Sequence, residues 1–191
     1  MKKIFKQVFF CVVAMMSIMS TTQVANANSS NYDDEYLTTK DCFDLGFQYL
    51  QAEEYDLAIP LLSISAEDGD IAAQYLLGAH YAYCNDISER DYELAFYWMY
   101  CSADQGNPYA FSTLGDFFFN GEVVDYDAET AFNSYEIAAN YGVNHAQYML
   151  GIMYSKGIGT EKDHDKALEW LAIANNNGHP DALDAILSLM D

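Results

Sequence analysis

The sequence predicts an all-α fold in which similar pairs of helices stack one after another, and three regular spacings carry this prediction. Glycines close four similar segments at intervals of 37, 36 and 36 residues, at Gly69, Gly106, Gly142 and Gly178. Two sets of alanines keep the same intervals: Ala58, Ala95, Ala131 and Ala167, and Ala73, Ala110, Ala146 and Ala182. A fixed period of this length is typical of a solenoid, whose repeats bury their apolar faces only against their neighbours.

The chain begins with the features of a secretory signal. Lysines at positions 2, 3 and 6 precede an apolar run from about residue 8 to residue 19, and Ala25-Asn26-Ala27 has the form of a cleavage site. A membrane-spanning helix takes about 20 apolar residues, so this run favours a cleaved signal over residues 1–27, with an uncleaved anchor as the alternative. Residues 28–39 are expected to form a flexible acidic tail. The sequence thus predicts a periplasmic or secreted protein without stable membrane insertion.

The charge of the chain is strongly negative, with 29 acidic against 8 basic residues. All the acidic residues but only five of the basic ones lie beyond residue 27, so the mature chain would carry a net charge of −24. Such a field repels nucleic acids and anionic membranes, which bind through cationic groups. Basic proteins are the natural counterparts. The alternative that the acidic surface only confers solubility stays open at this point.

Each repeat is expected to contain two helices. The first carries a leucine-glycine pair, at Leu45-Gly46, Leu77-Gly78, Leu114-Gly115 and Leu150-Gly151. The leucine faces the core, and the glycine lets a neighbouring helix approach closely. The second helix begins at Glu54, Asp91, Asp127 or Asp163, where a carboxylate can cap free backbone amides. Within a repeat domain over residues 40–191, the repeats cover about 41–69, 70–106, 107–142 and 143–178, and a capping helix covers 180–190.

The fourth repeat carries a family resemblance. The segment from Ala146 to Tyr154 is followed by Gly157-Ile158-Gly159, by Asp163, by a segment from Lys166 to Trp170, and by Gly178. This pattern resembles the Sel-one-like repeat family, which is related to tetratricopeptide repeats. The resemblance covers about residues 41–190 and implies a right-handed α-α superhelix that holds proteins or peptides and performs no reaction. Repeat one departs most from the pattern and is expected to act as an N-terminal cap.

One stripe of the first helices is a candidate binding surface. Positions three before, one after and four after the aligned glycine lie on one helix face. In tetratricopeptide relatives the matching stripe lines a concave groove, so the resemblance implies a groove built from Phe43, Phe47, Leu50, Tyr75, Ala79, Ala82, Ser112, Asp116, Phe119, Tyr148, Ile152 and Ser155. Its expected polar rim is Tyr83, Tyr109, Asn120 and Lys156. Aromatic side chains make good binding anchors, although some of them can equally be buried by the curvature of the superhelix.

The sequence holds no pattern that indicates catalysis or a cofactor. It has no spaced His-Glu-x-x-His pair, no Gly-x-Ser-x-Gly elbow and no phosphate-binding glycine loop. The enzyme alternative is β-lactam binding or hydrolysis, which has been linked to cysteine-rich relatives, but their cysteine pair in each repeat is missing here. Cys42, Cys84 and Cys101 would survive export, and three pairings are possible. Cys101 stands where other repeats have isoleucine, which favours packing as a small buried residue.

We therefore expect an exported, non-enzymatic interaction scaffold that binds a protein or peptide, basic in character, in its groove. Two roles remain open: an adaptor of envelope complexes, or an immunity or inhibitor protein of the periplasm. An acidic inhibitor would match a basic toxin by charge.

Overall fold

The computed structural model describes residues 37–84, 90–121 and 123–190, and this part of the chain is helical without strands. The predicted signal peptide and most of the predicted acidic tail lie outside the described residues. The helices are α2 (Thr39–Gln51), α3 (Tyr55–Glu67), α4 (Ile71–Tyr83), α5 (Tyr92–Asp104), α6 (Pro108–Asn120), α7 (Ala128–Asn140), α8 (Asn144–Lys156), α9 (His164–Asn176) and α10 (Ala182–Met190). The predicted fold class, a solenoid of helical hairpins, is confirmed.

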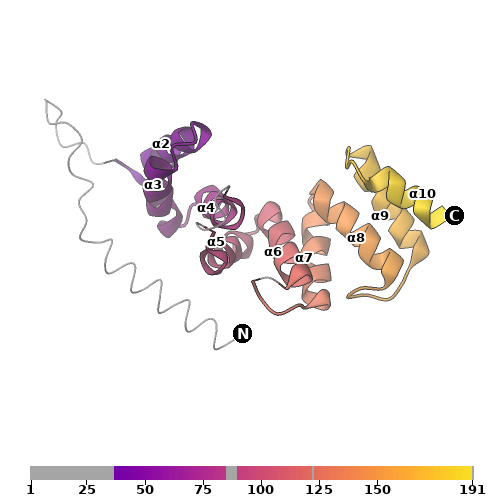
Figure 1. Cartoon of the computed structure of the whole chain (residues 1–191). Coiled ribbons are helices and arrows are strands. Elements are labelled where there is room, and N and C mark those ends of the chain that lie inside the picture. Colours follow the sequence, from indigo (N-terminus) through magenta and orange to yellow (C-terminus); the bar gives the residue numbers. More distant parts are fainter. Residues whose placement is uncertain (1–36, 85–89, 122, 191) are drawn as a thin grey trace, which may run out of the picture. The chain divides into compact units, whose positions relative to one another are not determined.

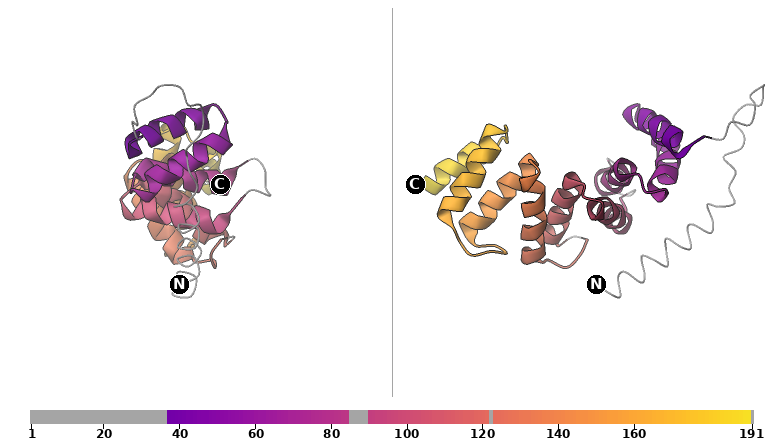
Figure 2. Two further views of the ribbon diagram at one scale, coloured as in Figure 1. Left: turned by 90° about the vertical axis from the view of Figure 1, so that its left-hand side faces the viewer. Right: turned by 180° about the vertical axis from the view of Figure 1, so that it is seen from behind.

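The chain divides into two compact units at Asp68 and Gly69. The first unit contains the hairpin α2/α3. The second contains the hairpins α4/α5, α6/α7 and α8/α9, which follow one another in chain order, with α10 packed against α9 (Figures 1 and 2). The first repeat is therefore described by itself, and the stacked solenoid is described for residues 69–190.

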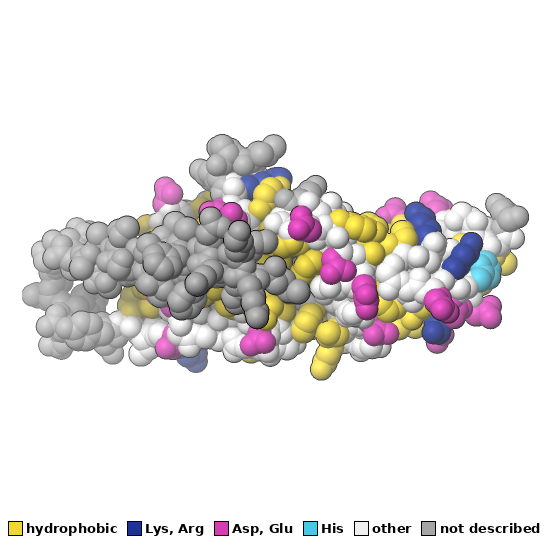
Figure 3. Space-filling view, turned by 90° about the horizontal axis from the view of Figure 1, so that it is seen from below, with side chains coloured by type: hydrophobic (Ala, Val, Ile, Leu, Met, Phe, Trp, Pro, Cys, Tyr) yellow, Lys and Arg dark blue, Asp and Glu magenta, His cyan; other side chains and the backbone are white. Residues whose placement is uncertain are grey.

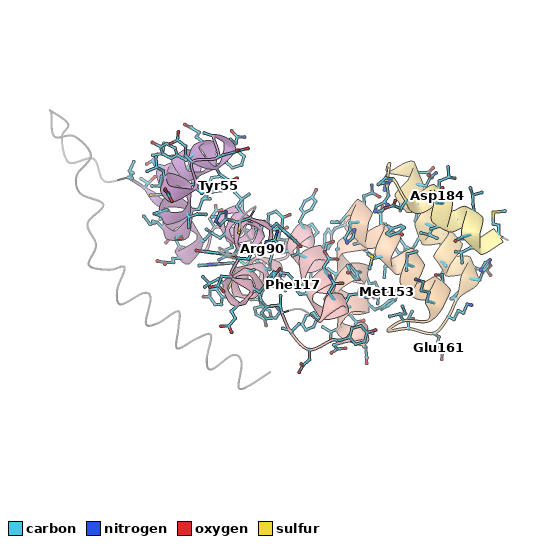
Figure 4. All side chains as sticks on the ribbon, in the orientation of Figure 1. Tyr55, Arg90, Phe117, Met153, Glu161 and Asp184 are labelled. Atoms are coloured by element: carbon cyan, nitrogen blue, oxygen red, sulfur yellow. The ribbon has the colours of Figure 1, made fainter. Side chains whose placement is uncertain are left out.

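The two alanine ladders lie in the core. All eight alanines are completely buried, and the space above each first-helix glycine is filled by a second-helix side chain. These pairs are Gly46 with Leu62, Gly78 with Met99, Gly115 with Tyr135 and Gly151 with Leu171. Phe117 and Met153, labelled in Figure 4, belong to two core clusters of the second unit. The periodic small residues thus mark the places where helices approach most closely.

Carboxylate caps start three of the four second helices. The side chains of Asp91, Asp127 and Asp163 accept hydrogen bonds from the backbone amides of Leu94, Thr130 and Lys166. Glu54 precedes α3 without such a bond, so the predicted cap is wrong for the first repeat. A glutamate is one methylene longer than the side chains that fit this position best.

The turn between the paired helices differs in the first repeat, which has no glycine at this position. Gly121 and Gly157 end α6 and α8 in the left-handed conformation. The first hairpin has Ala52 at the corresponding position, and there the positive φ of 60° falls on Glu53. A side chain in this region strains the backbone by about 1–2 kcal/mol, so the first hairpin is turned at a cost that α6/α7 and α8/α9 avoid.

In two hairpins a buried glutamine of the first helix forms a hydrogen bond with the end of the second helix. The periodicity of the sequence did not predict these hydrogen bonds. Gln74 of α4 accepts a hydrogen bond from the Gln105 side chain at 2.9 Å, and Gln147 of α8 accepts one from the Asn177 side chain at 2.8 Å. Both bonds join the start of a first helix to the end of its second helix. They fix how the first helices are presented to their neighbours.

Candidate protein-interaction surface

The first helices of the second unit, α4, α6 and α8, present most of the predicted site residues. Tyr83 and Tyr109 are more than half exposed, at 56% and 58%, and Asn120 and Lys156 are also exposed. Half-buried positions are Tyr75, Ala79, Asp116, Phe119, Tyr148 and Ile152. Figure 3 shows one face of the molecule, on which acidic side chains lie scattered among hydrophobic ones. A surface of this kind offers aromatic anchors in a negative field.

Three small residues of the predicted stripe are buried in the structure and are not on its surface. Ala82, Ser112 and Ser155 are buried, and the Ser155 hydroxyl donates to the Ile152 carbonyl oxygen at 2.8 Å. Phe119 packs partly on the core and lies 6.5 Å from the Tyr126 ring, measured between ring centroids. Ala82, Ser112 and Phe119 are therefore poor candidates for direct binding.

Phe43 and Phe47 lie on α2 of the first unit. Their rings stack with centroids 6.0 Å apart and planes inclined by 5°, and Phe47 is 37% exposed. Leu50, also on α2, is half-buried. This aromatic pair belongs to the first unit alone.

Side-chain contacts join the first helices into a continuous row. The Tyr75 ring of α4 lies 6.1 Å from the Tyr109 ring of α6. Asp116 of α6 pairs with His145 of α8 through Oδ1 and Nε2 at 2.9 Å. The row continues where the Tyr148 ring stacks on the ring of His179, just before α10, with centroids 4.2 Å apart. We call the set Tyr75, Tyr83, Tyr109, Asp116, His145, Tyr148 and His179 the first-helix row.

Two members of this row, His145 and His179, were missing from the sequence prediction. Tyr109 and His145 directly precede the ladder alanines Ala110 and Ala146, three residues before the predicted stripe begins on each helix. Extending the stripe by one turn toward the N-terminus would have added His145, whereas Tyr109 was already predicted as part of the rim. His179 follows the closing Gly178, where the helical period gives no signal.

A fully buried tyrosine connects the row to the core. Tyr135 of α7 occupies the position held by Leu62, Met99 and Leu171 in the other repeats, and its ring fills the space above Gly115. Its hydroxyl donates a 2.7 Å hydrogen bond to Asp116 Oδ1. Burial, together with the charge of Asp116, raises the pKa of Tyr135 well above its usual value, so this phenol stays a neutral donor.

The negative charge of Asp116 also affects the pKa of Tyr83. Burial of the hydroxyl and the negative charge of Asp116 raise the pKa of Tyr83 to about 12, against the opposing effect of its hydrogen bond with Thr113. The ring is nevertheless largely exposed. Tyr83 is therefore an exposed aromatic residue whose hydroxyl is affected by the charge of Asp116.

The hydrogen bond with Asp116 also raises the pKa of His145, and this effect outweighs partial burial. A raised pKa in the folded state means that the pair contributes stability below the unfolded value of about 6.5, which is lost as the pH rises through the folded pKa. Burial and the nearby His145 lower the pKa of His179, so its contribution has the opposite sign and is lost as the pH falls.

We expect the substitution Asp116→Asn to lower the pKa of His145 to or below its ordinary value, because only the burial effect would remain. NMR titration of the imidazole protons measures this pKa directly. Asp104→Asn, an exposed substitution of the same chemistry on α5, serves as the control and should leave it unchanged. An unaltered His145 pKa in the Asp116 variant would show that the pair does not form in solution.

The fourth repeat adds an open cavity of about 540 Å³ at one end of the row. Tyr148, Ile152, Ser155 and Lys156 of α8 line one wall, so the structure brings together all the residues predicted for this repeat. The residues lining the other wall belong to α10 or directly precede it: Asp181, Asp184, Ala185, Ser188 and Leu189. The C-terminal helix therefore helps to form the surface as well as covering α9.

Groups that could carry chemistry or a metal are sparse in the described part of the chain. It contains no cluster of three or more His, Cys, Asp or Glu residues suited to a metal ion. Among the described residues, Cys42, Cys84 and Cys101 form no disulfide bond, and Cys42 is buried while Cys101 is only half-buried. No described helix combines the length and the apolar character that crossing a bilayer requires.

These features define a helical-hairpin solenoid of the tetratricopeptide-related class. The Sel1 repeat family model matches residues 71–107, 114–142 and 144–179, and the chain belongs to the Sel1 repeat family. Proteins with these repeats typically act as scaffolds for protein-protein interactions, and the fold is generally non-enzymatic. The first hairpin lies outside the three matches.

Two solved structures and one curated protein illustrate the similarity. A Sel1 repeat protein from Oxalobacter formigenes is 36% identical, with a TM-score of 0.60, over 66% of this chain and 95% of that one. The structure of c5321, a protective antigen present in uropathogenic Escherichia coli strains, is 29% identical, with a TM-score of 0.70, over 76% of this chain and 32% of that one. An exopolysaccharide production negative regulator of Rhizobium leguminosarum is 28% identical over 75% of this chain. The chain spans 58% of that regulator's length.

Proposed function

We propose that this chain is an exported, non-enzymatic binding protein that holds a basic protein on its first-helix row. The observation that carries the proposal is the exposure of Tyr83 and Tyr109, which belong to the same first-helix row as the half-buried Asp116. Exposed tyrosines bury much area on binding at a small cost in side-chain entropy. The family's general role in protein interactions supports the same function.

Charge favours a basic partner. Acidic residues outnumber basic ones by 29 to 8 in the whole chain, and removal of residues 1–27 would take away three of the eight. Opposite charge speeds association and weakens binding to acidic competitors. The export signal itself lies outside the described residues, so periplasmic or secreted location rests on the sequence. Cleavage after Ala27 would give a mature chain that begins at Asn28, which mass measurement of the exported protein can test.

Two biological roles fit this binding activity. An immunity or inhibitor protein would capture one basic toxin or enzyme and block it, whereas an adaptor would capture a component of an envelope complex. The nature of the captured protein distinguishes them, because inhibition of a catalytic activity supports only the first role.

The test is capture from an envelope extract of the source organism, with residues 28–191 as bait. We expect a basic protein to be retained and to be lost from the double variant Tyr83→Ala, Tyr109→Ala, since aromatic anchors typically contribute about 2 kcal/mol or more when they are hot spots. Tyr141→Ala is the matched control, because Tyr141 follows α7, is 73% exposed and is not a member of the row. Equal capture by the double variant and the control would contradict the proposed surface.

A further inference from the structure

The Asp116 carboxylate has an asymmetric arrangement of hydrogen bonds. Tyr135 Oη and His145 Nε2 both lie within hydrogen-bond distance of the same oxygen, Oδ1, at 2.7 and 2.9 Å. A carboxylate oxygen has two lone pairs, so these two groups occupy Oδ1. Among the described residues no hydrogen bond is recorded for Oδ2, while the Asp116 side chain remains 26% exposed. One oxygen of this carboxylate is therefore held in place and the other is left for a donor from outside.

In the third repeat a core tyrosine holds this carboxylate. Leucine or methionine fills the corresponding core position in the other repeats, and an apolar side chain would suffice for packing. Tyr135 instead brings a hydroxyl from the core to the surface residue that follows Gly115. Because Tyr135 is neutral, it orients Asp116 without cancelling its charge. His145 cancels that charge only when the imidazole is protonated.

We propose that Asp116 receives one cationic side chain of the bound partner, an arginine or a lysine, through its free Oδ2. The exposed ring of Tyr83 lies close enough for the Asp116 charge to act on its hydroxyl, and it offers the cation an aromatic face. This inference rests on the proposed function, because it names the chemical group by which a basic partner is recognised. A hydrogen bond to a charged group is stronger than a neutral one, so this single contact can fix the position of the partner on the row.

Binding of the cation is linked to the protonation of His145. The partner's positive charge and the imidazolium charge both draw on the same carboxylate, so each weakens the other. The affinity of Asp116 for the cationic side chain of the partner therefore rises as the pH increases through the pKa of His145. The other titratable groups that interact with this pair are Tyr83 of α4, Tyr135 of α7 and His179 before α10, and Asp181 in turn acts on His179. Tyr83 and Tyr135 have raised pKa values and stay neutral over this range, which leaves the two histidines as the groups that titrate.

The experiment uses the full mature chain and follows the histidine resonances by NMR at low ionic strength, with His145→Gln assigning the His145 signal. The probes are N-acetyl-arginine amide, N-acetyl-lysine amide and the neutral N-acetyl-citrulline amide. We expect the arginine probe, the lysine probe or both to lower the pKa of His145. The citrulline probe, and potassium chloride at equal ionic strength, should not reproduce this shift. The response to each cationic probe shows whether the site takes arginine, lysine or either.

Two variants complete the test. Asp116→Asn keeps an acceptor for the Tyr135 hydroxyl, so the fold should survive. We expect this variant to bind the cationic probes about tenfold more weakly than the wild type does. The control Asp104→Asn makes the same change of charge and should bind as the wild type does. His145→Gln can still donate to Oδ1 and should bind the cation with a much smaller pH dependence, because only His179 still titrates. The inference is overturned if potassium chloride shifts the His145 pKa as much as the probes do, or if Asp116→Asn binds them unchanged. If the probes fail while a basic protein is still captured through Tyr83 and Tyr109, this inference falls and the proposed function stands.

Discussion

Gly159→Ala is expected to be severely destabilising, by about 3 kcal/mol, because two separate costs add at this position. Gly159 has a φ of 66°, in the left-handed region that a residue with a Cβ enters only under strain. An added Cβ would also overlap the backbone carbonyl of Ala128 and lie 3.1 Å from the Phe132 Cβ. Backbone atoms cannot move aside as a flexible side chain can. The loop after α8, in which Figure 4 labels Glu161, would have to withdraw from α7.

The control for this substitution is Gly178→Ala. Gly178 has a φ of 83°, but an added Cβ would meet no atom within 4 Å. Only the cost of the left-handed backbone conformation remains, so we expect the free energy of unfolding to fall by about 1 kcal/mol. Chemical denaturation of the two variants measures the difference. Similar losses in both would mean that the loop does not contact α7 closely, and the stacking of the last two hairpins would have to be reconsidered.

Ala146→Leu should destabilise the second unit by about 1–3 kcal/mol through overpacking. Ala146 is completely buried on α8, within a cluster that includes Leu150, Met153 and Ala167. Three extra carbon atoms at this position would push α8 away from its neighbours or force side chains out of their preferred rotamers. Ala110→Leu, at the same position of the preceding repeat and also completely buried, should behave alike.

Tyr83→Ala is the contrasting substitution, because Tyr83 is 56% exposed. Its loss should change the thermal midpoint far less than either alanine-to-leucine change, even though it removes much more side-chain volume. Thermal unfolding followed by circular dichroism provides the comparison. Equal shifts for the buried and the exposed position would contradict the assignment of core and surface stripes.

The core could be read from the sequence because it depends on short, regular spacing. The ladder alanines repeat every 36 or 37 residues, and so do the first-helix glycines Gly78, Gly115 and Gly151. A regular interval places equivalent residues on the same face of each amphipathic helix. The outer limit of the binding stripe could not be read in this way. Ala82, Ser112 and Ser155 share the helical angle of the stripe, but they are buried in the folded chain.

The hydrogen-bonded cluster around Asp116 could not be predicted from the sequence for a different reason. Asp116, Tyr135 and His145 come from three helices, and their meeting depends on how two successive repeats are stacked. A repeat pattern describes what the units have in common. Tyr135 departs from that pattern, and a departure at a core position gives no indication of which surface residue it reaches.

The affinity of the captured basic protein for three forms of the mature chain tests the account most directly: wild type, Asp116→Asn and Asp104→Asn. Binding to wild type should weaken as the ionic strength rises from about 0.1 M to about 1 M, which shortens the Debye length from about 10 Å to about 3 Å. At low salt, Asp104→Asn should bind as the wild type does, and Asp116→Asn should bind about tenfold more weakly. A partner that binds all three forms equally, with an affinity that does not change with salt, would contradict the account.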